Sequence, residues 1–424
     1  MPDKESKKHI VFIDCTGNSI ETLFRALDRG FSVSLYYNRK LYEANVHTYF
    51  STLPITGIVE LDTLDEEELF SALSSSKVVI DAVINVRDAS ILVSAKVCSR
   101  LNILFTSPRG IKNCLDKSIT RLLTQEANQI PVRSVLVEHV SNIKKVALDF
   151  GFPLVIKPKT GHSSLLCYKV ENSDELELAT SELVSKIRHL PDFTTYDISS
   201  EFVVEEFIVG DILSVELAIQ GPKKVRLLLS GRTSHNLNPC IGLGSIVPAI
   251  VDEKVACECF EYAEKICNLI ELDYGIFNIE IVYTADGPRL LEVNPRCMGG
   301  RMLRAYEIAF RKSFHDFLID LSLARIIYAN HSEHFGQVLI RKLITENCGR
   351  ITRRLDFSVF NQPFVEIKMY NMTTPRLIDE MEIIGRIIIS HPSISQSFRI
   401  AEELTNQIGL ALNISLLNGK ELFY

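Results

Sequence analysis

The sequence predicts an α/β chain of several domains, with a parallel sheet at the N-terminus and mixed α+β parts after it. Its 424 residues exceed what one core usually holds. Hydrophobic residues make up 46% and charged residues 23%, as in ordinary folded proteins. Strand and helix patterns alternate over about the first hundred residues, and such alternation is typical of a parallel sheet with right-handed crossovers.

The N-terminal elements follow from short apolar runs and the residues that interrupt them. An apolar run at 9–14 predicts a strand, helical spacing over 20–29 predicts a helix that ends at Gly30, and 31–37 predicts a second strand. Further along, we expect a strand over 77–84, a helix over 89–100 and a strand over 103–105. The first turn holds a single glycine, Gly17, so the three-glycine fingerprint of a nicotinamide cofactor site is missing.

The remaining elements alternate less regularly. A helix is expected over 107–130, where Pro131 ends it, and an amphipathic helix over 252–270. Strands are predicted over 135–137, 154–157, 202–207, 212–220, 225–230 and 386–390, with further helices over 143–150 and 395–408.

Residues 275–300 carry the clearest chemical pattern. Two strands flank an Asp-Gly turn, which is a strong hairpin signal. If the register is even, Glu280 and Glu292 lie side by side, and two carboxylates at that distance repel each other unless something neutralises them. With Asn294 they form the oxygen ligand set that magnesium prefers. The alternative is a polar hairpin face exposed to solvent, without a metal.

Several segments together resemble one family. Leu-Glu-Val-Asn-Pro-Arg at 291–296, with Glu280 upstream, resembles the metal-binding signature of the ATP-grasp superfamily. Four further pieces follow the family's order: Asp116-Lys117 at a helix start, Gly-Phe-Pro-Leu-Val-Ile-Lys-Pro at 151–158, a loop at 160–164, and Val-Glu-Glu-Phe-Ile-Val-Gly at 204–210. Each piece alone is weak. Their order over most of the chain is similar to biotin-carboxylase-like members, and among these to the L-amino acid ligases that make dipeptides.

The resemblance implies a division of the chain into four parts. These are a Rossmann-like domain that precedes the ATP-grasp fold (1–113), a mobile lid region (114–209), a large subdomain with the metal site (210–330) and a closing C-terminal subdomain (331–424).

It also implies an activity, that of an ATP-dependent ligase. Such an enzyme joins a small carboxylate to an amine through an acyl phosphate, with amino acids as expected substrates, and releases ADP and phosphate. Glu280, Glu292 and Asn294 would bind Mg²⁺, with Mn²⁺ as an alternative. The implied ATP contacts are phosphate contacts from Lys117, Lys157, Ser163 and Ser164, and adenine contacts from Glu205, Glu206, Phe207 and Ile208. Ile212 stands where the family often has an acidic ribose contact, and Asp211 is adjacent.

The residues expected to take part in catalysis are basic. Arg296 would stabilise the transferring phosphoryl group and the later oxyanion. Arg301, after two glycines, would clamp a substrate carboxylate, unless it is an ordinary surface arginine. His235 would bind or deprotonate the amine, and the alternative is a solvated loop histidine.

Composition indicates which kinds of binding partner and which cellular compartment to expect. A net charge of −7 does not favour nucleic acid. No apolar run approaches the ~18 residues of a membrane span, and the apolar run at 10–13 is too short for a signal peptide. Scattered cysteines suggest a reduced, cytoplasmic protein, and a homodimer is possible.

Two rival functions stay open. One is a different ATP-grasp reaction, namely carboxylation or formyl transfer in purine-type metabolism. The other is a nucleotide-binding regulator without catalysis, against which the intact set of Glu280, Glu292 and Arg296 argues.

Overall fold

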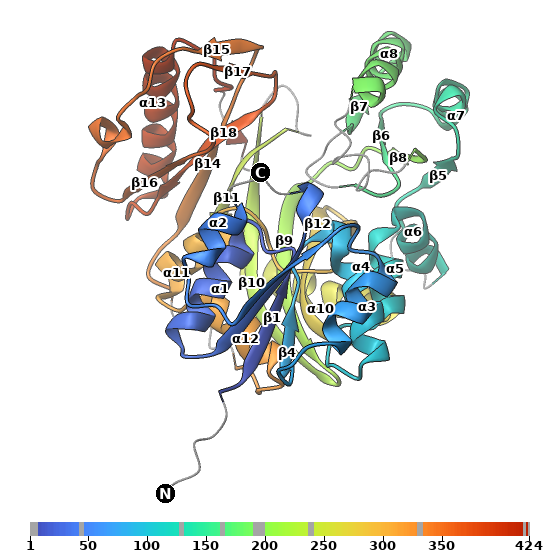
Figure 1. The fold of residues 1–424 in the computed structure, drawn as a ribbon. Helices are drawn as coiled ribbons and strands as arrows, with labels where there is room; N and C mark the ends of the chain where they lie inside the picture. The colour runs from blue at the N-terminus through green and yellow to red at the C-terminus, as the bar shows by residue number, and fades with distance from the viewer. Residues whose placement is uncertain are drawn as a thin grey trace, which may run out of the picture.

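A base and two lobes make up the molecule, and α8 and α13 mark the two lobes (Figure 1). The computed structural model describes residues 7–41, 46–126, 131–161, 166–189, 200–235, 241–328, 334–418 and 421–422. No helix in these ranges is long and apolar enough to cross a membrane.

The N-terminal part is a parallel sheet, as predicted. Its strands are, in sheet order, β3 (Gly57–Leu61), β2 (Ser32–Asn38), β1 (His9–Ile13) and β4 (Ala82–Ile84). The helices before β4 are α1 (Asn18–Asp28), α2 (Val46–Ser51) and α3 (Glu66–Ser74), and α4 (Asp88–Arg100) follows it. Both faces of β1 are buried, which explains its continuous apolar sequence.

Three expectations for this half were wrong in detail. Residues 103–105 form no strand among the described residues; Ile103 and Phe105 pack into the core, but the backbone leads directly to α5 (Pro108–Leu115). The strand expected over 77–84 covers only β4. The helix expected over 107–130 is divided between α5 and α6 (Lys117–Glu126), because Asp116 has an extended backbone and caps the second helix through its side chain; its last residues lie outside the described ranges.

The lobe marked by α8 is a small antiparallel sheet with helices on it. Its strands are, in sheet order, β5 (Ser134–Val137), β8 (Phe202–Glu206), β6 (Leu154–Pro158) and β7 (Tyr168–Val170). Its helices are α7 (Ile143–Phe150) and α8 (Ser173–His189), which pack on one apolar core with the strands.

A large antiparallel sheet runs from the base into the other lobe. Its strands are, in order, β13 (Gly287–Asn294), β12 (Tyr274–Thr284), β9 (Asp211–Gln220), β10 (Lys223–His235), β11 (Gly242–Val247), β14 (Val338–Ile344), β18 (Ile383–Ile389) and β16 (Val365–Met369), and β19 (Glu421–Leu422) pairs with β10. A separate pair is β15 (Gly349–Ile351) with β17 (Arg376–Ile378).

Helices cover this sheet on both faces. One face packs on α10 (Glu253–Leu269), and the other on α11 (Met302–Phe310) and α12 (Phe314–Ser322). In the second lobe α13 (Ile394–Leu412) packs against β14 and β18. The described structure therefore confirms the predicted fold class, while the four domain boundaries stay predictions.

Candidate active site

The β12–β13 hairpin places two carboxylates directly opposite each other. Glu280 and Glu292 are register partners, and a bulge follows between Glu280 and Ile281. The side chains are 26% and 28% exposed, so both line a space that solvent can reach. Asn294, two residues after Glu292, is the register partner of Asn278. The alternation of the sequence thus puts all three predicted metal ligands on one face of the hairpin.

The two predicted phosphate lysines lie beside this pair. Lys117, at the start of α6, has its Nζ 2.9 Å from Oε1 of Glu292 and donates to the carbonyl of Gly161 at 3.3 Å. Lys157, on β6, has its Nζ 2.7 Å from Oε2 of Glu205. Both lysines are more than nine-tenths buried.

Glu205 lies in the interior between two cations. Besides Lys157, it accepts both nitrogen donors of Arg121, at 2.9 and 3.1 Å. Although burial alone would raise the pKa of Glu205, Arg121 and Lys157 together lower it to about 2. Arg121 also donates to the carbonyl of Leu291 at 2.7 Å, so the Glu205 cluster is tied to the strand that carries Glu292.

The two hairpin carboxylates differ in charge environment. Burial and the neighbouring Glu292 both raise the pKa of Glu280. For Glu292, burial would also raise the pKa, but Lys117 and Lys157 outweigh it and lower the pKa. The neighbouring lysines therefore favour the charged form of Glu292, whereas burial and the charge of Glu292 favour the protonated form of Glu280.

Arg296 points toward the N-terminal domain. Its guanidinium group donates to Oδ2 of Asp88 at 2.6 Å and to the carbonyl of Cys297 at 3.1 Å. Burial would lower the pKa of Arg296, but Asp88 raises it, so the group stays charged. Asp88 begins α4 after a short loop that follows the carboxyl end of β4, so its contact with Arg296 connects the parallel sheet to the segment after the β12–β13 hairpin.

A chain of hydrogen bonds lies behind the predicted metal ligands. Asn294 donates to Asn278 at 2.9 Å, and Asn278 donates to the buried Glu216 at 2.5 Å. The other oxygen of Glu216 accepts the backbone N–H of Met298 at 3.0 Å. Burial raises the pKa of Glu216 to about 8. The chain fixes both the side chain of Asn294 and the loop that leads to Arg301.

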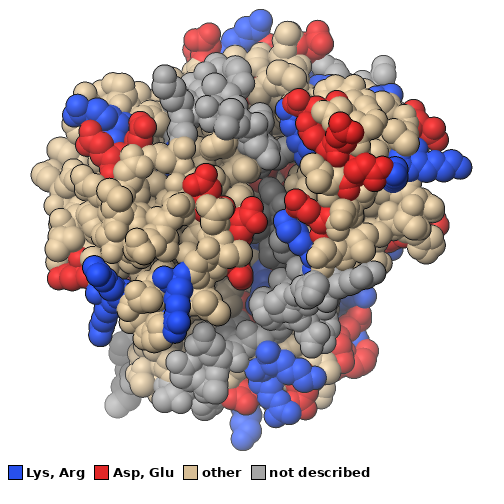
Figure 2. Space-filling view, turned by 90° about the horizontal axis from the view of Figure 1, so that it is seen from above, with Lys and Arg blue, Asp and Glu red and all other residues tan. Residues whose placement is uncertain are grey.

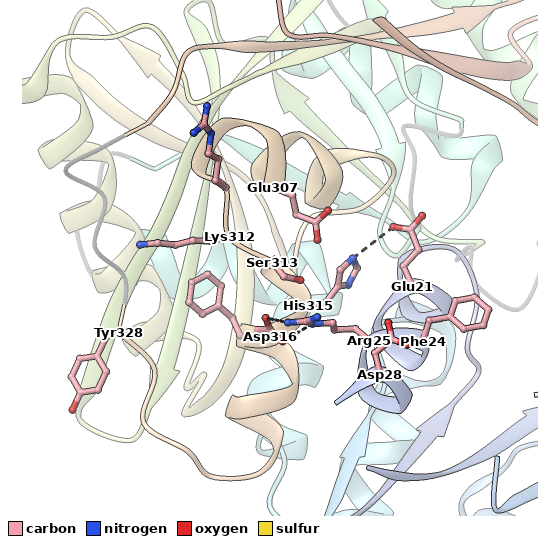
Figure 3. A pocket seen from close by; sticks show the side chains of 12 residues that line it. Glu21, Phe24, Arg25, Asp28, Glu307, Lys312, Ser313, His315, Asp316 and Tyr328 are labelled. Carbon is pink, nitrogen blue, oxygen red and sulfur yellow. Dashed lines mark hydrogen bonds and ion pairs between the residues drawn. The ribbon is translucent and has the colours of Figure 1, made fainter. Parts of the chain in front are cut away.

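Arg301 is held by carboxylates of the protein. It donates to Glu21 of α1 at 2.8 Å and lies 3.9 Å from Glu366 of β16. Glu21 also faces His315, 3.6 Å away, at the edge of a pocket of about 740 Å³ between α1 and the α11–α12 pair (Figure 3). The structure thus places Arg301 in a contact between domains, and its predicted substrate contact would require it to leave Glu21.

The other predicted residues are spread around the site. Glu206 accepts the backbone N–H of Arg133 at 2.8 Å and pairs with Arg289, and Lys169 lies over the Phe207 ring. Ile208 follows β8 and Asp211 begins β9. His235 ends β10, paired with β19. Ser163 and Ser164 lie outside the described residues.

Sequence reasoning missed four residues of this site. Arg121, Asp88 and Asn278 each hold a predicted residue in place, and Glu216 holds Asn278. Glu216 and Asn278 carried a usable signal, since each is a polar residue inside an apolar strand. Asp88 carried none, because its partner Arg296 is more than two hundred residues away.

Comparisons with known proteins agree with the fold. Residues 150–304 match the family described as ATP-grasp domain. A crystal structure of L-amino acid ligase from Bacillus licheniformis superposes with a TM-score of 0.78 at 16% identity, over 98% of this chain and 99% of that one.

Two curated relatives are more similar in sequence but longer than the matched region. Carnosine synthase 1 from Homo sapiens is 22% identical over 260 residues, which is 59% of this chain and 31% of that protein. Alanine–anticapsin ligase from Bacillus amyloliquefaciens is 23% identical over 261 residues, 57% of this chain and 54% of that protein. The predicted resemblance is confirmed at residues 150–304, which match an ATP-grasp domain, and the described chain shares the fold of the L-amino acid ligase structure.

Proposed function

We propose that this protein is an ATP-dependent carboxylate–amine ligase that forms an amide bond through an acyl phosphate, with amino acids as substrates. The observation that carries the proposal is the direct pairing of Glu280 and Glu292 between the Lys117 and Arg232 side chains, at 2.9 and 3.9 Å. Carboxylates that can hold a cation, flanked by basic side chains, suit the polyphosphate of ATP. Phosphoryl transfer depends on positioning the phosphates and on neutralising their negative oxygens.

The donor set fits a divalent cation. Two carboxylates share one face of the hairpin with an amide, and hard oxygen ligands are those that Mg²⁺ binds; Mn²⁺ also accepts them. We assign Glu280, Glu292 and Asn294 as the ligands, and a bound cation would neutralise phosphate oxygens of ATP. The Asn278–Glu216 chain keeps the amide of Asn294 oriented toward that role.

The nucleotide would lie between the α8 lobe and the large sheet. Lys117 on α6 points to Glu292 of the hairpin, and Lys157 on β6 points to Glu205 of β8. With ATP bound, the two ammonium groups would contact phosphate oxygens, while Arg121 keeps Glu205 charged and in place. We keep Glu206, Phe207, Ile208 and Asp211 as the candidates for adenine and ribose contacts, because they join β8 to β9 beside the lysines.

Arg296 is the proposed electrostatic catalyst. In the first half-reaction a substrate carboxylate attacks the terminal phosphate of ATP, and ADP leaves. In the second, an amine attacks the acyl carbon, the carbonyl becomes an oxyanion, and phosphate leaves as the amide forms. The guanidinium group of Arg296 donates to Asp88 at 2.6 Å, which holds it in one orientation. It is therefore preorganised to stabilise the negative charge that develops in each step.

The test is ADP release from ATP and Mg²⁺ with a panel of amino acids, singly and in pairs, with and without hydroxylamine. Hydroxylamine converts an acyl phosphate into a hydroxamate. We expect ADP release that requires one carboxylic acid, yields its hydroxamate, and accelerates with a second amino acid.

Other outcomes would reassign the protein. Release that requires bicarbonate or formate would indicate carboxylation or formyl transfer. ATP binding without release over the whole panel would indicate a regulator that does not catalyse. Either result would reject the ligase proposal while leaving the match of residues 150–304 to an ATP-grasp domain unchanged.

A further inference from the structure

The same sheet face that carries the acidic pair also carries a basic cluster, formed by Arg232, Lys342 and Arg386. The strand register connects the two. Across the sheet, Glu280 pairs with Ser214, and Ser214 pairs with Ser230, two residues before Arg232. Register partners and residues two apart lie on one face, so Arg232 shares the face of Glu280.

The register continues from Arg232 into the second lobe. Arg232 pairs with Ser245, and Ser245 pairs with Ile340, two residues before Lys342. Lys342 in turn is the partner of Arg386 on β18. The three cations therefore face the same side of the sheet as the predicted metal ligands, from β10 to β18.

Two side chains of the cluster, those of Arg232 and Arg386, lie close to a predicted metal ligand or to the loop that follows Arg296. Arg232 lies 3.9 Å from Glu280. Arg386 lies against the loop that follows Arg296, because a Cβ built on Gly300 would be 3.2 Å from its guanidinium carbon. A Cβ on Gly242 would lie 2.5 Å from Nε of Arg232, so this glycine leaves room for the arginine to lie on the backbone. Figure 2 shows the molecule hollowed between its two lobes, with charged side chains along the hollow.

Charge is not balanced within this cluster. Burial, together with the Arg232 and Arg386 guanidinium groups, lowers the pKa of Lys342 to about 7 against the opposing effect of Glu280. Glu280 is thus the carboxylate that faces Lys342, and it is also a proposed metal ligand. The ammonium group of Lys342 makes no hydrogen bond or ion pair with any residue in the described ranges. A bound anion would complete the site, since guanidinium groups and an ammonium group together suit a carboxylate.

We propose that Arg232, Lys342 and Arg386 bind the carboxylate of the acceptor substrate, so that the amine donor of the ligation is an amino acid. This inference rests on the proposed ligase function and specifies its second substrate. The carboxylate to be activated must reach the phosphate side of the site, near Lys117 and Arg296. The basic cluster lies on the other side of Glu280, where a second substrate would present its amine to the acyl phosphate.

The experiment compares the two half-reactions in the full chain. Acceptors are the common amino acids, each supplied as the free acid and as its carboxamide, which keeps the amine and removes the negative charge. The variants are Lys342→Met and Arg386→Gln, and the matched control is Lys368→Met. Lys368 is the register partner of Arg386 on the next strand, but it is exposed at the sheet edge.

For the wild type and the control we expect a lower KM for the free acid than for the carboxamide. In Lys342→Met and Arg386→Gln the KM for the free acid should rise by about 10- to 100-fold, the size expected for one lost charged hydrogen bond. The KM for the carboxamide and the rate of hydroxamate formation should stay within about 3-fold.

Three results would overturn the inference. An equal KM for acid and carboxamide in the wild type would show that no acceptor carboxylate is recognised. An unchanged KM for the free acid in both variants would place its binding elsewhere. Loss of hydroxamate formation in the variants would assign the cluster to the first substrate. The absence of hydroxamate in the wild type would instead reject the ligase function itself, so the two failures are distinguishable.

Discussion

The two ends of one sheet face differ in charge and in how the protein balances that charge. At the β12–β13 end, Glu280 and Glu292 repel each other, and Lys117 offsets this at 2.9 Å from Glu292. At the β14–β18 end, Lys342 and Arg386 repel each other, and Glu280 provides the opposing charge for Lys342. The acidic end is thus compensated by the protein and, in our proposal, by a cation. The basic end keeps an excess of positive charge, which we propose that a substrate carboxylate neutralises.

The largest expected effect comes from breaking the acidic end. Glu292→Gln keeps the shape of the side chain but removes a charge from the proposed metal site. We expect Mg²⁺-dependent ADP release to fall by roughly a thousand-fold or more, because a metal ligand supports several kcal/mol of charge stabilisation. Circular dichroism should show an intact fold.

The control for this variant is Glu253→Gln, an exposed carboxylate at the start of α10, which should keep the wild-type rate. Full activity of Glu292→Gln at saturating Mg²⁺ would contradict the metal assignment and leave the polar hairpin face as the better interpretation.

A second test asks how much the buried ion pair between Arg121 and Glu205 contributes to the stability of the fold. Arg121→Met removes the two-pronged partner of Glu205 and leaves a buried carboxylate with Lys157 alone. We expect a loss of about 3 to 5 kcal/mol in the free energy of unfolding, measured with urea. Arg226→Met, which breaks a half-exposed pair with Glu264, should cost about 1 kcal/mol or less. Equal losses in the two variants would contradict the distinction.

A third test concerns the positive charge of Arg296. Arg296→Ala should lower turnover by about 100- to 1000-fold, as removal of a preorganised donor does, and change ATP affinity far less. Isothermal titration with ATP and Mg²⁺ measures the affinity, and a coupled ADP assay measures the rate. A parallel loss of ATP affinity would mean that Arg296 binds the ground state and would reject its role in the transition state.

The comparison also explains which parts the sequence could predict. The acidic end lies on one hairpin, so the Asp-Gly turn was enough to predict that its two strands pair. The turn register alone would place Glu280 opposite Leu291, and the bulge between Glu280 and Ile281 shifts its partner to Glu292. The basic end is assembled from β10, β14 and β18, which are far apart in the sequence, and no local pattern sets their register. Its signal was the presence of cations inside apolar strands, two in Val-Leu-Ile-Arg-Lys-Leu-Ile and one in Ile-Ile-Gly-Arg-Ile-Ile-Ile. Such cations deserve a functional interpretation because burying them is costly.

The smallest expected effect tests the uncompensated basic end directly. The folded-state pKa of Lys342, about 7, lies below its ordinary value of 10.5, so folding is penalised while the ammonium is charged. The penalty is complete below about pH 7 and disappears as the pH rises toward 10.5, because the native protein releases its proton first. Lys342→Met should therefore be more stable than the wild type by about 1 to 2 kcal/mol at pH 6, and by less at pH 9.

Urea unfolding at both pH values, without ligands, measures this difference, and Lys368→Met should show none at either pH. A destabilised Lys342→Met at pH 6 would mean that the protein already compensates the ammonium, and the excess charge assigned to the acceptor carboxylate would not exist. If Lys342→Met is more stable than the wild type and also loses the preference for free amino acids, the ammonium of Lys342 destabilises the fold but is needed to bind the acceptor carboxylate.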